Sequence, residues 1–221
     1  MDEDNCRANR DLLKGFERNP VFAHMHPYDL YRQWLEAVWA MLELPLDPKG
    51  FRAALDRYTY EQGRELGRLF GLYVEAVEDL PFRDILGSLF MRLDVNSVRA
   101  GQYFTPWPIA EMMARMTFDR EEFLRLVKER GSVSVCDPAC GSGVMLLAFG
   151  KVVHDALGRD GTNRLRLYGM DIDSRCVEMC RIQLRMNGLD GMGRMASVLC
   201  GLGKTEPAQA ALFTEFERVP A

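Results

Sequence analysis

The sequence has no apolar run as long as a membrane-spanning helix, which needs about 20 consecutive apolar residues. Its first residues, MDEDNCRANR, are acidic and polar, and they lack the apolar stretch of a secretory signal peptide. Both absences argue against a membrane protein, and we expect a cytoplasmic location. With 48% hydrophobic and 27% charged residues, the 221-residue chain has the composition of a globular protein that can bury a core.

An excess of positive charge is also lacking, since the formal net charge is −4 at pH 7. Lysine and arginine alternate with acidic residues, as in FDREEFLRLVKER, a mixture that is typical of a solvated helix face. A protein that binds DNA by itself usually carries a basic surface. The charge therefore argues against autonomous DNA binding, and we expect DNA contact only as part of a complex.

Cysteine is present at six positions but gives no clear metal site. Cys136 with Cys140, and Cys176 with Cys180, form two C-x3-C pairs, a wider spacing than that of a zinc knuckle. The second pair also fits one apolar face of a helix. In a cytoplasmic protein these residues are expected to be free thiols, and no metal site is predicted.

The first hundred residues predict helices, because no alternating β pattern appears among them. In residues 26–44 the apolar side chains follow one helical stripe, formed by Leu30, Trp34, Leu35, Val38, Trp39 and Leu42. Asp47 is placed to cap the next helix, with Pro48 at its first position. Residues 61–80 and 82–93 form two further amphipathic segments.

The pattern changes after Gly131, where strand-like and helix-like segments begin to alternate. They follow in the order 132–136, 144–157, 164–170, 173–187 and 195–200. Such an order of strands and helices is typical of a parallel, doubly wound sheet. We therefore predict an α/β fold, with a helical N-terminal domain at 1–100 and a Rossmann-like domain at 101–221.

Two strands of the predicted sheet end in acidic residues at its carboxyl edge, where open α/β sheets bind ligands. In VCDPACGSG, Asp137 ends the first strand, and Gly141 and Gly143 allow the backbone to approach a ligand closely. In YGMDID, Asp171 is placed to accept hydrogen bonds from both hydroxyls of a ribose, whereas Asp173 fits a helix N-cap. A tight strand-to-helix turn without a ligand is the other interpretation of the glycines.

A glycine loop with a ribose-binding acid suits either a dinucleotide or S-adenosylmethionine. The dinucleotide fingerprint G-x-G-x-x-G needs a third glycine, but Leu146 stands three residues after Gly143. The phosphate-binding sequence G-x4-G-K-[ST] is absent as well. Before the loop, GQYFTP opens another helix, which Thr105 is expected to cap with Pro106 in its first turn.

The segments GQYFTP and DPACGSG, in this order and spacing, resemble those of the adenine-N6 DNA methyltransferases. FRDILGSLFMRL before them and YGMDIDSRCVEMCRIQLRMNG after them are similar to the same family, in particular to the modification subunits of type I restriction–modification systems. The resemblance covers roughly residues 80–200 and implies S-adenosylmethionine as the cofactor. It implies that Asp171 holds the ribose and that two segments enclose the methionine end. Those segments supply Tyr103, Thr105, Pro106, Asp137, Pro138, Ala139, Cys140, Gly141, Ser142 and Gly143.

The sequence departs from that family at the residues that carry the chemistry. The family flips adenine out of the duplex and binds its amine with an Asn/Asp/Ser-Pro-Pro-aromatic motif. None of the ten prolines here is adjacent to another, so the motif is absent and no catalytic residue is predicted. Leu202 stands where the family tends to place a polar residue near the cofactor's adenine. Residues 201–221 are too few for the remaining strands, so we expect an incomplete sheet.

Three hypotheses follow from these observations. The chain is an S-adenosylmethionine-binding, adenine-N6 methyltransferase-like protein that is inactive alone or needs a partner chain. Alternatively, it is a non-catalytic regulatory or anti-restriction subunit, or a fragment of a longer methyltransferase. Because an incomplete sheet exposes an edge, we expect a partner, either a methyltransferase or specificity subunit or a second copy of the chain. Leu212, Phe213 and Phe216 form an apolar stripe that would cover such an edge or dock on a partner.

Overall fold

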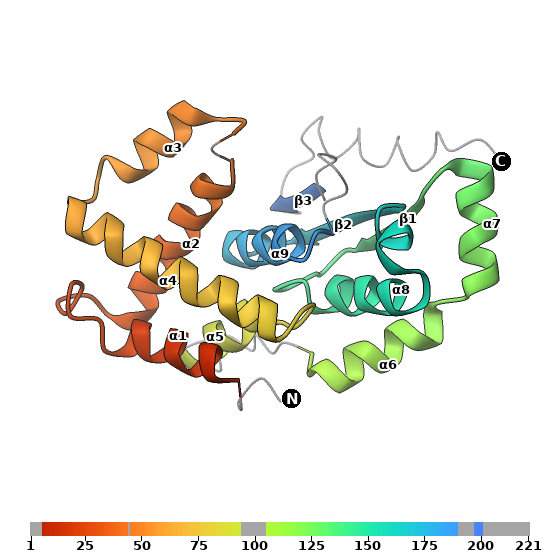
Figure 1. The fold of residues 1–221 in the computed structure, drawn as a ribbon, viewed down its shortest axis with the longest axis horizontal. Helices are drawn as coiled ribbons and strands as arrows, with labels where there is room; N and C mark the ends of the chain where they lie inside the picture. Colours follow the sequence, from red (N-terminus) through yellow and green to blue (C-terminus); the bar gives the residue numbers. More distant parts are fainter. Residues whose placement is uncertain (1–5, 44, 94–104, 190–196, 201–221) are drawn as a thin grey trace.

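A computed structural model describes residues 6–43, 45–93, 105–189 and 197–200 of the chain (Figure 1). Helices predominate, and three parallel strands form one small sheet within these residues. The helices α1 to α5 lie on one side of the molecule and the sheet, with α8, lies on the other (Figure 1). None of the helices in the described ranges is both long and apolar enough to cross a membrane.

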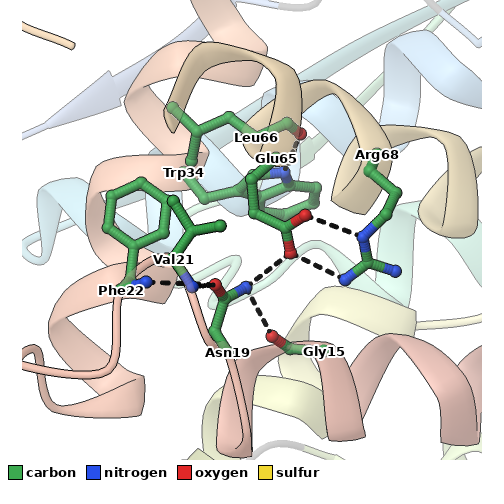
Figure 2. Close-up of polar contacts among 8 residues, drawn as sticks. All are labelled: Gly15, Asn19, Val21, Phe22, Trp34, Glu65, Leu66 and Arg68. Carbon is green, nitrogen blue, oxygen red and sulfur yellow. Dashed lines mark hydrogen bonds and ion pairs between the residues drawn. The ribbon is translucent and has the colours of Figure 1, made fainter. Parts of the chain in front are cut away.

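The N-terminal part consists of five helices around an aromatic core. They are α1 (Arg7–Glu17), α2 (Pro27–Glu43), α3 (Pro48–Leu55), α4 (Tyr60–Asp79) and α5 (Ile85–Leu93). Trp34 on the predicted stripe of α2 is fully buried, and its ring meets those of Phe16 and Tyr73 at 5.3 and 5.7 Å between centroids. The indole nitrogen of Trp34 donates to the carbonyl oxygen of Leu66 on α4 at 3.2 Å, so the ring is both packed and hydrogen-bonded (Figure 2).

The C-terminal part contains the strands β1 (Val133–Asp137), β2 (Leu165–Asp171) and β3 (Ser197–Cys200) in the spatial order β1-β2-β3. All neighbouring strands are parallel, with Asp137 opposite Gly169 and Asp171 opposite Cys200. Helix α8 (Val144–Thr162) connects β1 to β2, and α9 (Ser174–Met186) follows β2. The predicted α/β alternation is confirmed in this region, and the carboxyl ends of β1 and β2 lie at one edge of the sheet.

Helix α9 belongs to both hydrophobic cores of the molecule. Its residues Cys176, Met179 and Ile182 pack into the core of the N-terminal helices. Val177 and Cys180 face the other core, which contains α8, β1, β2 and the helices α6 (Trp107–Thr117) and α7 (Arg120–Arg130). Figure 1 accordingly shows α9 between α2 and the sheet. The predicted boundary near residue 100 lies outside the described residues, so the ranges 1–100 and 101–221 remain a prediction.

Most predicted helix ends are confirmed. Asp47 accepts a hydrogen bond from the Gly50 amide at 2.9 Å and caps α3, with Pro48 at the first position. Asp173 caps α9 by accepting from the Arg175 amide at 2.9 Å. The left-handed Gly188, with φ of 65°, follows the end of α9 as its Asn-Gly sequence predicts.

Two expectations about helix ends were wrong. Thr105 does not cap α6, because Pro106 keeps an extended ψ of 140° and is itself the N-cap, so the helix begins at Trp107. The predicted helix 144–157 is too short, because α8 continues as far as Thr162 after a break at Gly158. The conformation of Gly158, with φ of 64° and ψ of −158°, is open only to glycine, and the chain returns to helical geometry beyond it.

Candidate functional site

The glycine loop between β1 and α8 is held against β2 by its own backbone. The Cys140 amide donates to the carbonyl oxygen of Met170 at 2.8 Å, and the Gly143 amide donates to that of Cys140 at 2.8 Å. Gly141 and Gly143 have φ of 53° and 96°, values that side chains rarely allow. A Cβ added at Gly143 would lie 2.7 Å from the sulfur of Cys180. The loop therefore needs glycine both for its conformation and for its close approach to α9.

Asp171 joins the end of β2 to this loop. Its Oδ2 accepts a hydrogen bond from the Gly141 amide and its Oδ1 accepts one from the Asp173 amide, both at 2.9 Å. The side chain is half-buried at the carboxyl edge of the sheet. The structure thus brings together the two features that the sequence predicted for one site, the glycine loop and the acid. Asp173 has the separate role of helix cap, as expected.

The site is electrically negative. Burial raises the pKa of Asp137, and the carboxylate of Asp171 nearby adds to this increase, while the hydrogen bond from the Ala139 amide opposes it. Two carboxyl groups at one edge of a sheet favour a ligand with positive charge. An apolar surface lies next to them, because the side chain of Ile172 is 75% exposed.

The other predicted half of the site is described only in part. Tyr103 lies outside the described residues. Thr105 and Pro106 line an open pocket of about 280 Å³ together with Asp84 and residues of α5. The carboxylate of Asp84 accepts a hydrogen bond from the hydroxyl of Ser142 in the glycine loop at 2.6 Å. Asp84 therefore contacts the glycine loop through Ser142 and also lines the pocket that Thr105 and Pro106 line.

The remaining loop residues differ in exposure. Pro138 and Ala139 are exposed, whereas Cys140 and Ser142 are buried. The thiol of Cys180 contacts that of Cys140, and this contact together with burial raises the pKa of Cys180 well above its ordinary value. A thiol with a raised pKa is a poor nucleophile. Among the residues described, no group of three or more His, Cys, Asp or Glu side chains is arranged to hold a metal ion.

Sequence reasoning missed Asp84 and Gln183, which contact the loop from α5 and α9. An aspartate immediately before an apolar helix predicts only an N-cap. Asp84 does fill this role, because it accepts a hydrogen bond from the Gly87 amide at 3.0 Å. Gln183 is fully buried, and it donates to Asp84 and to the Ser142 carbonyl oxygen, both at 2.8 Å. A glutamine on the apolar face of the predicted helix was the available signal, because buried polar groups need partners.

Comparison with known proteins gives a family match that includes this region. A family model described as N-6 DNA Methylase matches residues 83–200, more than half of the chain. The chain is also 31% identical over 90 residues to the Type I restriction enzyme MpnII methylase subunit of Mycoplasma pneumoniae. This alignment covers 41% of the chain but only 14% of the length of that relative. The matched family region contains Asp84, the glycine loop and Asp171.

Proposed function

Because the chain belongs to the N-6 DNA methylase family, we propose that it binds S-adenosylmethionine at the edge formed by the glycine loop and Asp171. It would serve there as the cofactor-binding part of an adenine-N6 DNA methyltransferase of the restriction–modification type. The hydrogen bond between the Gly141 amide and the Asp171 carboxylate is the observation that carries this proposal. It unites the loop and the acid in one site, as a nucleoside-containing cofactor requires.

The described residues fit this cofactor in charge and in hydrogen-bonding capacity. S-adenosylmethionine carries a positively charged sulfonium and an ammonium group, and Asp137 and Asp171 supply negative charge at the same edge. An ionised carboxylate has about four acceptor positions, so Asp171 can still accept from ribose hydroxyls beside its two backbone donors. The exposed side chain of Ile172 offers an apolar face to a purine ring.

Within this proposal each segment has a distinct task. Asp171 orients the ribose, and the loop 137–143 brings backbone groups close to the methionine end. Thr105 and Pro106, with Tyr103 before them, would cover that end from the side of α6. When bound, the cofactor supplies an electrophilic methyl group, and this chain's residues hold it in place and keep water from it.

Methyl transfer needs residues that this sequence does not contain. The amine of adenine is a weak nucleophile, and a positioned set of acceptors is needed to orient its lone pair toward the methyl group. No two prolines are adjacent here, so the Pro-Pro motif must come from another segment or chain. We propose that the three strands belong to a larger Rossmann-like sheet, with 1–100 as a helical domain and 101–221 as the cofactor-binding half. A specificity subunit, a methylase subunit or a second copy would be the partner, and DNA would bind to that complex.

The absence of the Pro-Pro motif also favours a second candidate, a non-catalytic regulatory or anti-restriction subunit. Such a subunit would keep the family fold as an interaction surface without using the cofactor site. The two candidates differ in one property, the affinity for S-adenosylmethionine.

Calorimetric titration of the full chain with S-adenosylmethionine separates these candidates. We expect saturable binding by the wild type, and a loss of at least about tenfold in affinity for Asp171→Ala, since a charge-assisted hydrogen bond is removed. Asp56→Ala is the matched control, because it removes the same side chain from the exposed end of α3. An absence of wild-type binding at millimolar cofactor would reject the proposal and favour the regulatory subunit.

A further inference from the structure

A buried polar cluster joins three segments that are distant in the sequence. Asp84, at the start of α5, is only 6% exposed, and Ser142 and Gln183 are fully buried. The Oδ2 of Asp84 accepts from the Ser142 hydroxyl at 2.6 Å, and its Oδ1 accepts from the side-chain amide of Gln183 at 2.8 Å. We call Asp84, Ser142 and Gln183 the loop clamp.

The loop clamp leaves little freedom to the glycine loop. Gln183 donates to the backbone carbonyl oxygen of Ser142 at 2.8 Å and accepts from the Leu86 amide at 3.0 Å. Ser142 is therefore held at both its hydroxyl and its carbonyl group. A Cβ added at Gly87 would lie 2.3 Å from Oδ2 of Asp84 and 2.5 Å from the Ser142 hydroxyl oxygen. The backbone of α5 therefore lies too close to the loop clamp for a side chain at this position.

A helix cap alone does not explain this arrangement. Capping of α5 uses one oxygen of Asp84, which accepts from the Gly87 amide, and an asparagine or a serine would do the same. Burial of a carboxyl group is unfavourable, and burial raises the pKa of Asp84 accordingly. Among the described residues, the second oxygen accepts a hydrogen bond from the loop alone, at Ser142.

We propose that Asp84 is a positioning residue for the cofactor, acting through Ser142 to hold the glycine loop in its binding conformation before the cofactor arrives. The inference rests on the proposed function, because it assigns Asp84 to the same site. A loop that is ordered in advance loses less conformational entropy on binding, and so binds more tightly. Asp84 itself need not touch the cofactor.

The test measures the dissociation constant of S-adenosylmethionine for the full chain and three variants. Asp84→Asn keeps an oxygen for the Gly87 amide but faces Ser142 with an NH2 group, so the hydroxyl loses its charged acceptor and can only accept a neutral hydrogen bond. Ser142→Ala removes the hydroxyl itself. Each single variant is expected to bind about tenfold more weakly, the equivalent of one hydrogen bond to a charged group. The double variant should bind no more weakly than the weaker single variant, because both changes remove the same charge-assisted hydrogen bond.

A second buried polar cluster supplies the structural control (Figure 2). The side-chain amide of Asn19 donates to the Gly15 carbonyl oxygen at 2.9 Å and to Glu65 at 2.7 Å, and its oxygen accepts from the Val21 and Phe22 amides. This cluster joins α1 to α4 and does not contact the loop clamp. Asn19→Ala should lower the melting temperature and leave the dissociation constant unchanged.

Hydrogen exchange of the ligand-free chain gives an independent measure of loop order. The Cys140 and Gly143 amides, which are hydrogen-bonded in the loop, should exchange faster in Asp84→Asn than in the wild type. Amides within α4 should exchange at unchanged rates. If Asp84 holds the loop in place, faster exchange should be confined to the loop. A general loss of stability would instead speed exchange in α4 as well.

The outcomes separate this inference from the proposed function. If the wild type binds the cofactor and both single variants bind equally well, the role of Asp84 is rejected and the proposed function stands. Additive losses in the double variant, or an equal loss in Asn19→Ala, would also reject it. If the wild type does not bind, the proposed function fails and the positioning role fails with it.

Discussion

Single residues of the site are held mainly by backbone groups. Both carboxylate oxygens of Asp171 accept hydrogen bonds from main-chain amides. The Cys140 and Gly143 amides donate to carbonyl oxygens of β2 and of the loop itself. Since these donors belong to the fold, the conformation of the loop is decided by which positions permit an unusual backbone. Gly143 is the most constrained of them, with a φ of 96° and the sulfur of Cys180 within contact of any added Cβ.

Gly143→Ala should therefore reduce the free energy of unfolding by about 2–4 kcal/mol. A positive φ costs an alanine roughly 1–2 kcal/mol, and the displacement of Cys180 adds the cost of overpacking. Urea denaturation measures the difference. Gly67→Ala is the control, because Gly67 is exposed in α4 with open space around it, and alanine there should stabilise by about 0.5–1 kcal/mol. Equal urea midpoints for Gly143→Ala and the wild type would show that an alanine fits at this position without strain.

Glu178 on α9 should make stability depend on pH. Burial, and then the nearby carboxylate of Glu36, raise the pKa of Glu178 to about 7, against the opposing effect of Arg181 and Arg32. Because this folded pKa lies above that of the unfolded chain, its contribution to stability is full below the ordinary glutamate range. That contribution is lost as the pH rises through about 7.

The melting temperature of the wild type should thus fall between pH 5 and pH 8 by more than that of Glu178→Gln. We expect a difference of about 1 kcal/mol in the free energy of unfolding, since Glu178 keeps part of its contact with solvent. Identical pH profiles of the two proteins, followed by circular dichroism, would show that the charge of Glu178 is not destabilising.

Among the elements, α9 has the widest role, because its residues pack into both hydrophobic cores. Arg175 and Arg185 extend this role on its surface. Arg175 hydrogen-bonds to the hydroxyl of Tyr28, and Arg185 forms an ion pair with Glu43 at 3.4 Å. A helix that is shared in this way should couple the unfolding of the two parts of the chain.

Unfolding in urea should accordingly be a single transition. Tryptophan fluorescence reports on Trp34 and Trp39 in the core of the N-terminal helices and on Trp107 in the other core. Its change should coincide with the loss of helical circular dichroism. Met179→Ala, at a fully buried position of α9, should lower the common midpoint by an amount that corresponds to about 2–4 kcal/mol. Two separated transitions, only one of which moves in the variant, would instead indicate independent domains.

Local sequence patterns predicted the elements well where the determinants are local. Asp47 with Pro48, Asp173, and the Asn-Gly pair each mark a helix end through contacts within a few residues. The predicted start of α6 was one residue too early. Pro106 and Pro108 both stand where the first turn of a helix tolerates proline, so the sequence fits either start. The loop clamp could not be predicted, because Asp84 is 58 residues from Ser142 and 99 residues from Gln183. Only the packing of α5 and α9 brings these side chains together.

At the scale of the whole molecule, we propose that cofactor binding and methyl transfer depend on different segments. The matched family region contains the loop and Asp171, but the sequence has no adjacent prolines to bind a flipped adenine. The alignment with the type I methylase subunit covers 14% of that protein, so its activity as a whole is proposed for this chain only together with other segments. The central claim is therefore the cofactor site itself.

A crystal structure of the chain grown with S-adenosylmethionine tests that claim most directly. We expect density for the cofactor at the carboxyl edge of the sheet, with both ribose hydroxyls within hydrogen-bond distance of the Asp171 carboxylate. The methionine end should lie between the glycine loop and Thr105. Cofactor bound elsewhere, or an edge that stays empty at saturating concentration while Asp171 keeps both of its backbone partners, would contradict the account.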